Sequence, residues 1–385
     1  MLVIFAIMKD NPFPTSQYLG ADTFCDREYE TEALISNIRS RNSTTLTAVR
    51  RMGKTGLIFH IFELLKQEIL PIYTDILSTN SKLEFVNTLS ASIINAAPEK
   101  SSLGKKVWRF IKSLRPVISF DPLTGHPQVS IVGTEAKAEK DIHALLSFLN
   151  DLDVKVVIAI DEFQQILEYP EKNMDAWLRS VIQTLSNIVF VFSGSQRHLI
   201  TNLFTDPGRP FYRSTQILHF SSIRKEVYQH FIVEQFKKRN RQIPAEMAGK
   251  IWEWASGHTY YVQLLSNRLF ANCGKRISDQ DLNEEILKIL KEQEIIFYQY
   301  RELLTKSQWN LLKALGIEDV ITSPSSAEFI SRYQLGSSAS VLRSLDALVT
   351  KEMIYYNSDE NGKKQYQVYD VLLKRWLQLK FKNTY

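Results

Sequence analysis

The spacing of apolar residues changes repeatedly along the first half of the chain. Short apolar runs rich in β-branched residues, which are typical of strands buried on both faces, stand at 44–49, 71–77, 154–160 and 188–192. Between them, apolar residues recur every three or four positions, as on one face of a helix, at 26–41, 54–65, 81–97, 141–150 and 173–185. This alternation predicts an α/β domain with a parallel sheet and right-handed crossovers.

Residues 98–140 interrupt the alternation and are predicted to form an insertion. Its first part is a basic amphipathic helix, whose cationic residues are Lys105, Lys106, Arg109, Lys112 and Arg115. The runs VISF and QVSIV then flank the turn Asp121–Gly125, which predicts a β-hairpin. Two interpretations of the basic helix stay open: a solvated face, or a patch that binds a polyanion or a partner.

The pattern of apolar residues changes twice in the second half of the chain. Helical periodicity without strand signals runs through 222–240, 243–256, 259–272 and 279–297. Helical stretches at 306–315, 325–332 and 337–350 then precede two β-like runs, Met353–Asn357 and Gln365–Tyr369, which is the order of a winged helix. We therefore expect four parts: an irregular lead-in over 1–23, a sheet domain over 24–220, a helical lid over 221–302 and a winged helix over 303–385.

Composition narrows the class of protein. Of 385 residues, 44% are hydrophobic and 23% charged, and the net charge is +5, which is ordinary for a globular chain and too mild for a protein coated in basic charge. The two cysteines, Cys25 and Cys273, form no motif, so we expect reduced thiols in a cytoplasmic protein. The apolar start at residues 1–7 is too short to span a bilayer, and either Met1 or Met8 is the natural first residue. We expect no membrane association.

The segment Ala48–Thr55 matches the phosphate-binding pattern G-x-x-x-x-G-K-[ST] except at its first position, where alanine replaces glycine. A loop between a strand and a helix turns backbone N–H groups inward, and the helix directs its positive end at the phosphates. Lys54 is expected to reach the β- and γ-phosphates, and the Thr55 hydroxyl to ligate Mg²⁺. The residues predicted to contact ATP here are Arg50, Arg51, Met52, Gly53, Lys54, Thr55 and Gly56.

A second motif supports the first. The apolar run Val156–Ile160 ends in Asp161 and Glu162. Asp161 is expected to hold Mg²⁺ with Thr55, and Glu162 to activate the attacking water. The strand at 188–192 ends in Ser193-Gly194-Ser195. Either serine senses the γ-phosphate or orients water, or the segment is an ordinary turn. Together these motifs predict a P-loop nucleotide site in the α/β domain.

Several motifs in series resemble the archaeal-type ATPase family, of the STAND branch of AAA+-like P-loop NTPases. They are FCDREYETEALI at 24–35, RRMGKT at 50–55, IDEFQQI at 160–166, FSGSQ at 192–196, PFYRS at 210–214 and ASGHTYYVQLL at 255–265. The resemblance implies an ATPase core, a helical lid and a C-terminal winged helix. It also implies that Arg27 and Glu28 flank the adenine pocket, that Arg213 stabilises charge on the γ-phosphate, and that Gly257-His258 forms a turn of the lid. Tyr212 and Thr259 depart from the family's glycine and proline.

The sequence therefore predicts a protein that binds ATP and Mg²⁺ and hydrolyses ATP slowly as a conformational switch, with an unidentified protein partner. A DNA-binding regulator that holds ATP or ADP as a structural ligand is the main alternative, and a degenerate NTPase scaffold is a third. DNA contact would come from the helix at 337–350, which offers Ser337, Ser338, Ser340 and Arg343. Lys363, Lys364, Lys374 and Arg375 would add phosphate contacts.

Overall fold

The computed structural model describes residues 11–99, 101–113, 117–120, 127–130, 135–358 and 362–382. The chain divides into two compact units. One is Ser16–Ile223, and the other joins the described residues up to Thr15 to those from Arg224 onward. In the described part of the chain, no helix has the length and apolar character needed to cross a membrane.

The first unit contains a parallel sheet, as predicted, and this sheet has five strands. Its strands lie in the order β2 (Ile69–Asp75), β5 (Lys155–Asp161), β6 (Ile188–Gly194), β1 (Thr44–Thr47) and β7 (Gln216–His219). Strands β5 and β6 are buried almost throughout because helices cover both faces, which explains their unbroken β-branched runs. The sequence analysis missed the edge strand β7, because this strand has four residues of which only Leu218 is buried.

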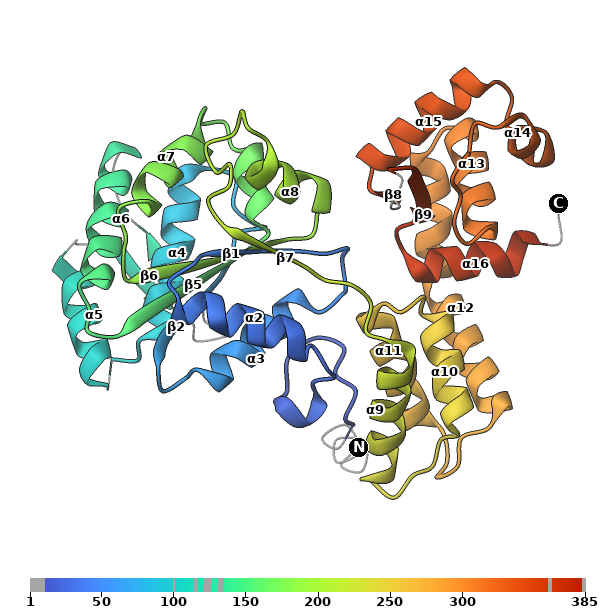
Figure 1. Cartoon of the computed structure of the whole chain (residues 1–385), viewed down its shortest axis with the longest axis horizontal. Helices are drawn as coiled ribbons and strands as arrows, with labels where there is room; N and C mark the ends of the chain where they lie inside the picture. Colours follow the sequence, from blue (N-terminus) through green and yellow to red (C-terminus); the bar gives the residue numbers. More distant parts are fainter. Residues whose placement is uncertain are drawn as a thin grey trace. The chain divides into compact units, whose positions relative to one another are not determined.

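Two helical layers enclose this sheet (Figure 1). Helices α2 (Glu28–Arg39) and α3 (Lys54–Leu64) cover one face. The other face is covered by α4 (Lys82–Ala96), α5 (Ser102–Ser113), α6 (Glu135–Asn150), α7 (Met174–Ile182) and α8 (Arg197–Thr205). A short 3₁₀ helix, η1 (Ala21–Thr23), precedes α2, and a second, η2 (Phe163–Glu168), follows β5. The α/β prediction and its parallel sheet are thus confirmed.

The insertion contains the predicted helix and hairpin. In α5 the apolar Val107 and Ile111 face the core, whereas the cationic residues that lie within the helix are exposed. Strands β3 (Val117–Phe120) and β4 (Pro127–Ser130) pair in antiparallel fashion. The predicted turn Asp121–Gly125 and Arg115 lie outside the described residues, and neither interpretation of the basic helix is decided.

The second unit begins with four helices, α9 (Lys225–Lys237), α10 (Ala245–Trp254), α11 (Thr259–Asn272) and α12 (Asp279–Leu303). Part of the predicted lead-in packs among them. Phe13 is fully buried against Phe236 and Phe270, and Asn267 Nδ2 donates to the Phe13 carbonyl at 2.7 Å. The described residues of the lead-in up to Thr15 are therefore anchored in this unit.

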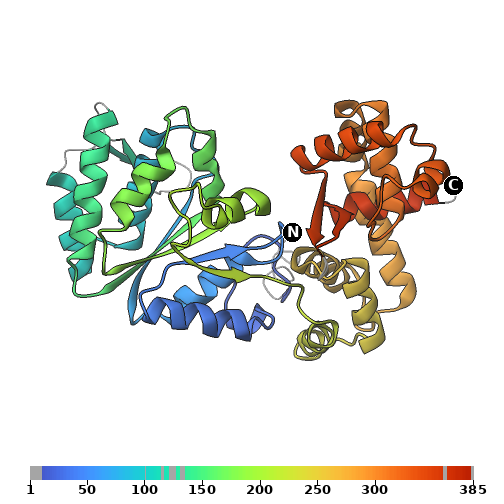
Figure 2. The same ribbon diagram turned by 45° about the horizontal axis from the view of Figure 1, so that its top comes forward.

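A winged helix completes the second unit. It comprises α13 (Lys306–Ile317), α14 (Ala327–Tyr333), α15 (Ser338–Thr350), β8 (Ile354–Ser358), β9 (Lys364–Val368) and α16 (Val371–Phe381). Figure 2 shows the β8–β9 hairpin beside α13 and α15, with which it makes contact. The last helix joins this domain to α12, because its buried Trp376 packs against Phe297 of α12 and Trp309 of α13.

Candidate active site

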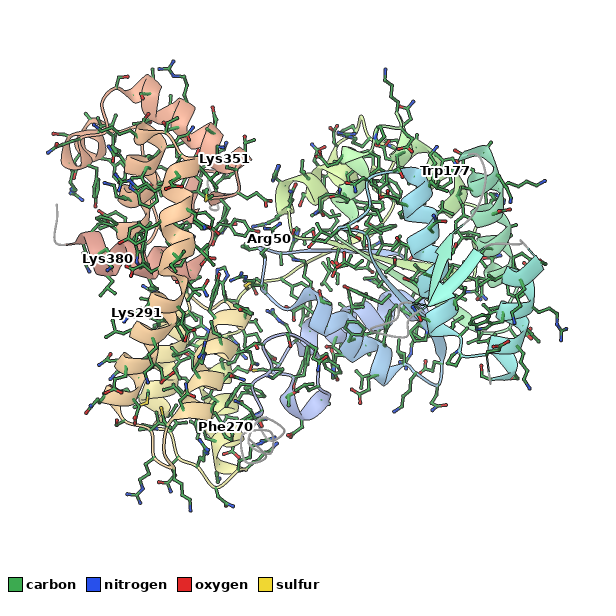
Figure 3. All side chains as sticks on the ribbon, turned by 180° about the vertical axis from the view of Figure 1, so that it is seen from behind. Arg50, Trp177, Phe270, Lys291, Lys351 and Lys380 are labelled. Carbon is green, nitrogen blue, oxygen red and sulfur yellow. The ribbon has the colours of Figure 1, made fainter. Side chains whose placement is uncertain are left out.

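The P-loop connects the carboxyl end of β1 to the amino end of α3. Two of its residues adopt left-handed backbone conformations, Arg51 with φ 67° and Gly53 with φ 95°. Ala48 is not among the positive-φ residues, so the motif's first position does not require glycine here. The side chains of Arg50, which is labelled in Figure 3, and Arg51 are exposed, whereas Met52 is buried.

Lys54 is a buried cation with little compensation. Its side chain is 7% exposed, and its ammonium donates one hydrogen bond, to the Ala48 carbonyl at 3.4 Å, within the described part of the chain. Burial lowers the pKa of Lys54, and the charges of Asp161 and Glu162 oppose that shift. A bound anion would stabilise the buried ammonium of Lys54, because a buried charge is costly unless it is paired. This is the situation expected of a lysine that binds phosphate.

Asp161 is the centre of the site. Its Oδ2 accepts hydrogen bonds from Thr55 Oγ1 at 2.8 Å and from Tyr73 Oη at 2.9 Å. Its Oδ1 accepts from Ser193 Oγ and from its neighbour's backbone N–H at 3.1 Å. The structure thus brings together three residues that the sequence analysis singled out, from α3, β5 and β6.

Tyr73 and Asp75 also belong to this edge of the sheet, and the sequence analysis missed both. They lie on β2, where Asp75 is directly opposite Asp161 in the strand register. Burial, followed by the charges of Asp161 and Glu162, raises the pKa of Asp75, while the N–H of Leu77 opposes the shift. Only the strand order places β2 next to β5, and the sequence does not give this order. The one sign in the sequence that β2 contributes to the site was a polar residue at its end.

Glu162 follows Asp161 in a left-handed conformation, with φ 57°, which is uncommon for a residue with a side chain. One carboxylate oxygen, Oε2, accepts three hydrogen bonds: from Gln164 Nε2 at 2.6 Å, from Ser195 N at 3.0 Å and from Ser195 Oγ at 2.7 Å. This network fixes the carboxylate and leaves Oε1 without a protein donor in the described part of the chain. The geometry of Ser195 supports a role that the sequence analysis did not consider, the positioning of Glu162.

The conformation of Gln164 depends on a glycine in the next strand. A Cβ atom on Gly194 would lie 2.1 Å from Gln164 Oε1, well inside any allowed contact distance. Gln164 is buried, with 4% of its surface exposed, so its amide has little room to move. Gly194 therefore makes space for the amide that holds Glu162.

Arg27 contacts the P-loop, and its place beside the adenine pocket stays a prediction. Its guanidinium is 4% exposed, forms an ion pair with Glu30 at 2.8 Å, and donates to the carbonyls of Ser221 at 2.7 Å and Met52 at 3.1 Å. Arg27 thus binds the P-loop through the Met52 carbonyl, and Glu30 positions the Arg27 guanidinium. Glu28, which shared the prediction, is exposed.

Arg213 is not near the P-loop of its own chain. It precedes β7, whereas the P-loop follows β1, and these two strands are parallel neighbours. Arg213 therefore lies at the amino edge of the sheet, and the nucleotide motifs lie at the carboxyl edge. The prediction that Arg213 contacts the γ-phosphate in the same chain is therefore wrong. Arg213 stands before β7 and the P-loop follows β1, so the length of a strand separates them.

Two cations assigned to DNA contact are occupied within the protein. Lys374 is 5% exposed and its Nζ lies 2.7 Å from Asp319 Oδ1. Arg375 donates to the backbone carbonyls of Trp254 at 2.7 Å and Glu253 at 2.6 Å, at the carboxyl end of α10. The lid residue His258 is buried at the start of α11. Arg343 and Lys364 remain exposed on the winged helix.

Known proteins share this architecture. A Walker-type ATPase of Pyrococcus abyssi superposes with a TM-score of 0.66 at 16% identity, over 95% of this chain and 99% of that one. The ORC2 protein of Aeropyrum pernix, in its ADPNP–ADP complexes, superposes with a TM-score of 0.56 at 11% identity, over 96% and 98%. A search of curated protein sequences found no match.

Two family matches cover most of the chain. Residues 295–379 match a winged helix domain family, which confirms the predicted C-terminal fold. Residues 24–265 match the family described as an ATPase domain predominantly from Archaea, and this match includes β1, the P-loop, β5 and β6. The chain belongs to this family of ATPase domains.

Proposed function

We propose that the protein binds ATP at the P-loop and hydrolyses it slowly in a Mg²⁺-dependent reaction that serves as a conformational switch. The observation that carries this proposal is the junction of Lys54, Thr55 and Asp161 at one edge of the sheet. A buried ammonium, a hydroxyl and a carboxylate meet there, at the amino end of a helix.

The donor set fits a magnesium nucleotide. Thr55 Oγ1 and Asp161 Oδ2 are hard oxygen ligands 2.8 Å apart, of the kind that Mg²⁺ prefers alongside phosphate oxygens and water. When bound, the ion would neutralise charge that develops on the phosphates. Tyr73 and Ser193 hold the Asp161 carboxylate in place, so that it meets the ligand already oriented.

Glu162 is proposed to accept the proton of the attacking water. Gln164 and Ser195 bind its Oε2, which leaves Oε1 to face the water. Slow turnover is expected of an isolated chain, because Arg213 lies at the other edge of the sheet and cannot stabilise the transition-state charge there.

Two variants test the assignment. We expect Lys54→Ala to lose ATP affinity in calorimetry while the fold persists, because the loop then lacks its buried cation. We expect Glu162→Gln to bind ATP normally and to turn over at least about tenfold more slowly in single-turnover assays, since general-base effects are typically 10²–10⁴-fold. Unchanged ATP affinity in folded Lys54→Ala would refute the site, and a wild-type rate in Glu162→Gln would refute the base.

The DNA-binding alternative has lost part of its support. Lys374 and Arg375 contact the protein itself, so that fewer cations are available for a phosphate backbone. A DNA titration at two salt concentrations, with Arg343→Gln as the comparison, distinguishes this function from a role in protein contact. A salt-dependent affinity that falls in the variant would favour DNA.

A further inference from the structure

We propose that the amino edge of the sheet carries a second anion site, specific for a phosphate group of a small molecule and separate from the P-loop. The site is a cavity of about 320 Å³ in the first unit. Arg41 before β1, Arg179 on α7 and Arg213 before β7 all line it. Three segments that are distant in sequence therefore contribute arginines to the lining of one cavity.

The charged residues that line this cavity are all of one sign. Its lining residues include three arginines and no aspartate or glutamate. None of the three forms an ion pair with a described residue, whereas Arg39 and Arg209, also in this unit, pair with Glu68 and Asp175. Three like charges around one cavity repel one another, and a bound anion would relieve this repulsion.

The polypeptide holds two of these arginines in disfavoured conformations. Arg41 has φ 60° and Arg213 has φ 51°, both in the left-handed region. Backbone strain of this kind tends to be retained where a site needs a particular geometry. Arg41 Nη1 reaches the Ser186 carbonyl at 3.3 Å, and the Arg213 guanidinium lies 5.1 Å from the Tyr212 ring centroid. These weak contacts leave most of the guanidinium donors for a ligand.

The chemistry favours phosphate over a carboxylate. A phosphate monoester carries up to two charges and three terminal oxygens, so it can engage several planar guanidinium forks at once. A single carboxylate has one charge and two oxygens, too few for three arginines. Asn42, Gln183 and Gln216 add neutral donors, and Ile182 and Phe192 add an apolar wall. A volume of about 320 Å³ is at the small end of ligand pockets, which fits a small phosphorylated molecule.

The test is a calorimetric titration of the full chain with pyrophosphate, with the P-loop already saturated by ADP and Mg²⁺. We expect saturable binding in the wild type, weakening of at least about tenfold in Arg179→Gln and in Arg213→Gln, and loss of binding in the double variant. Arg39→Gln is the matched control, because it removes the same charge outside the cavity and should bind like the wild type.

Several outcomes would overturn the inference. They are absence of pyrophosphate binding in the wild type, equal weakening in Arg39→Gln, and binding of single-stranded DNA in place of pyrophosphate. Retained ADP binding in each variant shows that the fold persists. Failure of ADP binding in the wild type would count against the proposed ATPase function. The pyrophosphate titration would then be made in Lys54→Ala, because this variant lacks the phosphate-binding lysine of the P-loop. The two proposals therefore fail separately.

Discussion

Substitution of Gly194 by alanine tests whether Gln164 positions the catalytic carboxylate. The added Cβ would lie 2.1 Å from Gln164 Oε1, and ordinary contact begins at about 3.4 Å, so the amide must move by about 1.3 Å. Such a shift breaks the 2.6 Å hydrogen bond from Gln164 Nε2 to Glu162. A hydrogen bond to a charged group contributes about 1.5–3 kcal/mol. If Glu162 is the base, that loss slows hydrolysis about 10- to 150-fold.

The assay measures single-turnover hydrolysis and ATP affinity in the same variants. Affinity should not change, because neither Gly194 nor Gln164 hydrogen-bonds to the P-loop in the described structure. Gly208→Ala is the control, since its nearest neighbour would lie 3.4 Å away and its φ is not positive. Glycine replacement in itself should therefore leave the rate unchanged.

A double-mutant cycle isolates the cause. In Gln164→Ala the clashing amide is absent, and the next atom near the new Cβ is Ile200 Cβ at 3.4 Å, which is a tolerable contact. Adding Gly194→Ala to this background should change the rate little, so the two effects are strongly non-additive. Equal slowing in both backgrounds, or a wild-type rate in Gly194→Ala, would refute the positioning role of Gln164.

Three further substitutions probe the rest of the structure. Arg27→Met should lower the free energy of unfolding in urea by about 3–5 kcal/mol, because it leaves a buried carboxylate unpaired, and it should weaken ATP binding by releasing the Met52 carbonyl. Unchanged stability would show that the pair is inert. Asp75→Asn should raise Tm at about pH 7, since the raised pKa of Asp75 means that its ionised form costs stability. The gain should shrink as pH falls through that pKa, and a constant gain would exclude this cause. Arg375→Ala should destabilise the second unit by about 2–4 kcal/mol, because two charge-assisted bonds to the end of α10 are lost, and hydrogen exchange at Trp254 should rise. Protection that matches the wild type would contradict this role.

Local sequence determined the elements that build the nucleotide site. The β-branched run Val156–Ile160 can be a strand buried on both faces, and the glycine and lysine at 53–54 can open a helix, whatever the rest of the chain does. Their order along the chain was enough to predict an α/β P-loop domain, a helical block and a winged helix. The family match confirms the ATPase domain, and the roles of Lys54, Thr55, Asp161 and Glu162 remain predictions.

Tertiary structure decided which residues meet. The order β2-β5-β6-β1-β7 places Tyr73 beside Asp161 and Ser195 beside Glu162, and it puts Arg213 at the opposite edge from the P-loop. Lys374 pairs with Asp319 inside the winged helix, and Arg375 binds the carboxyl end of α10. The spacing of apolar residues shows which face of a helix or strand is buried, but not which other element covers that face. Many strand orders would bury the same apolar surface. For that reason the sequence determined the elements of this protein, and only the folded chain decided their neighbours.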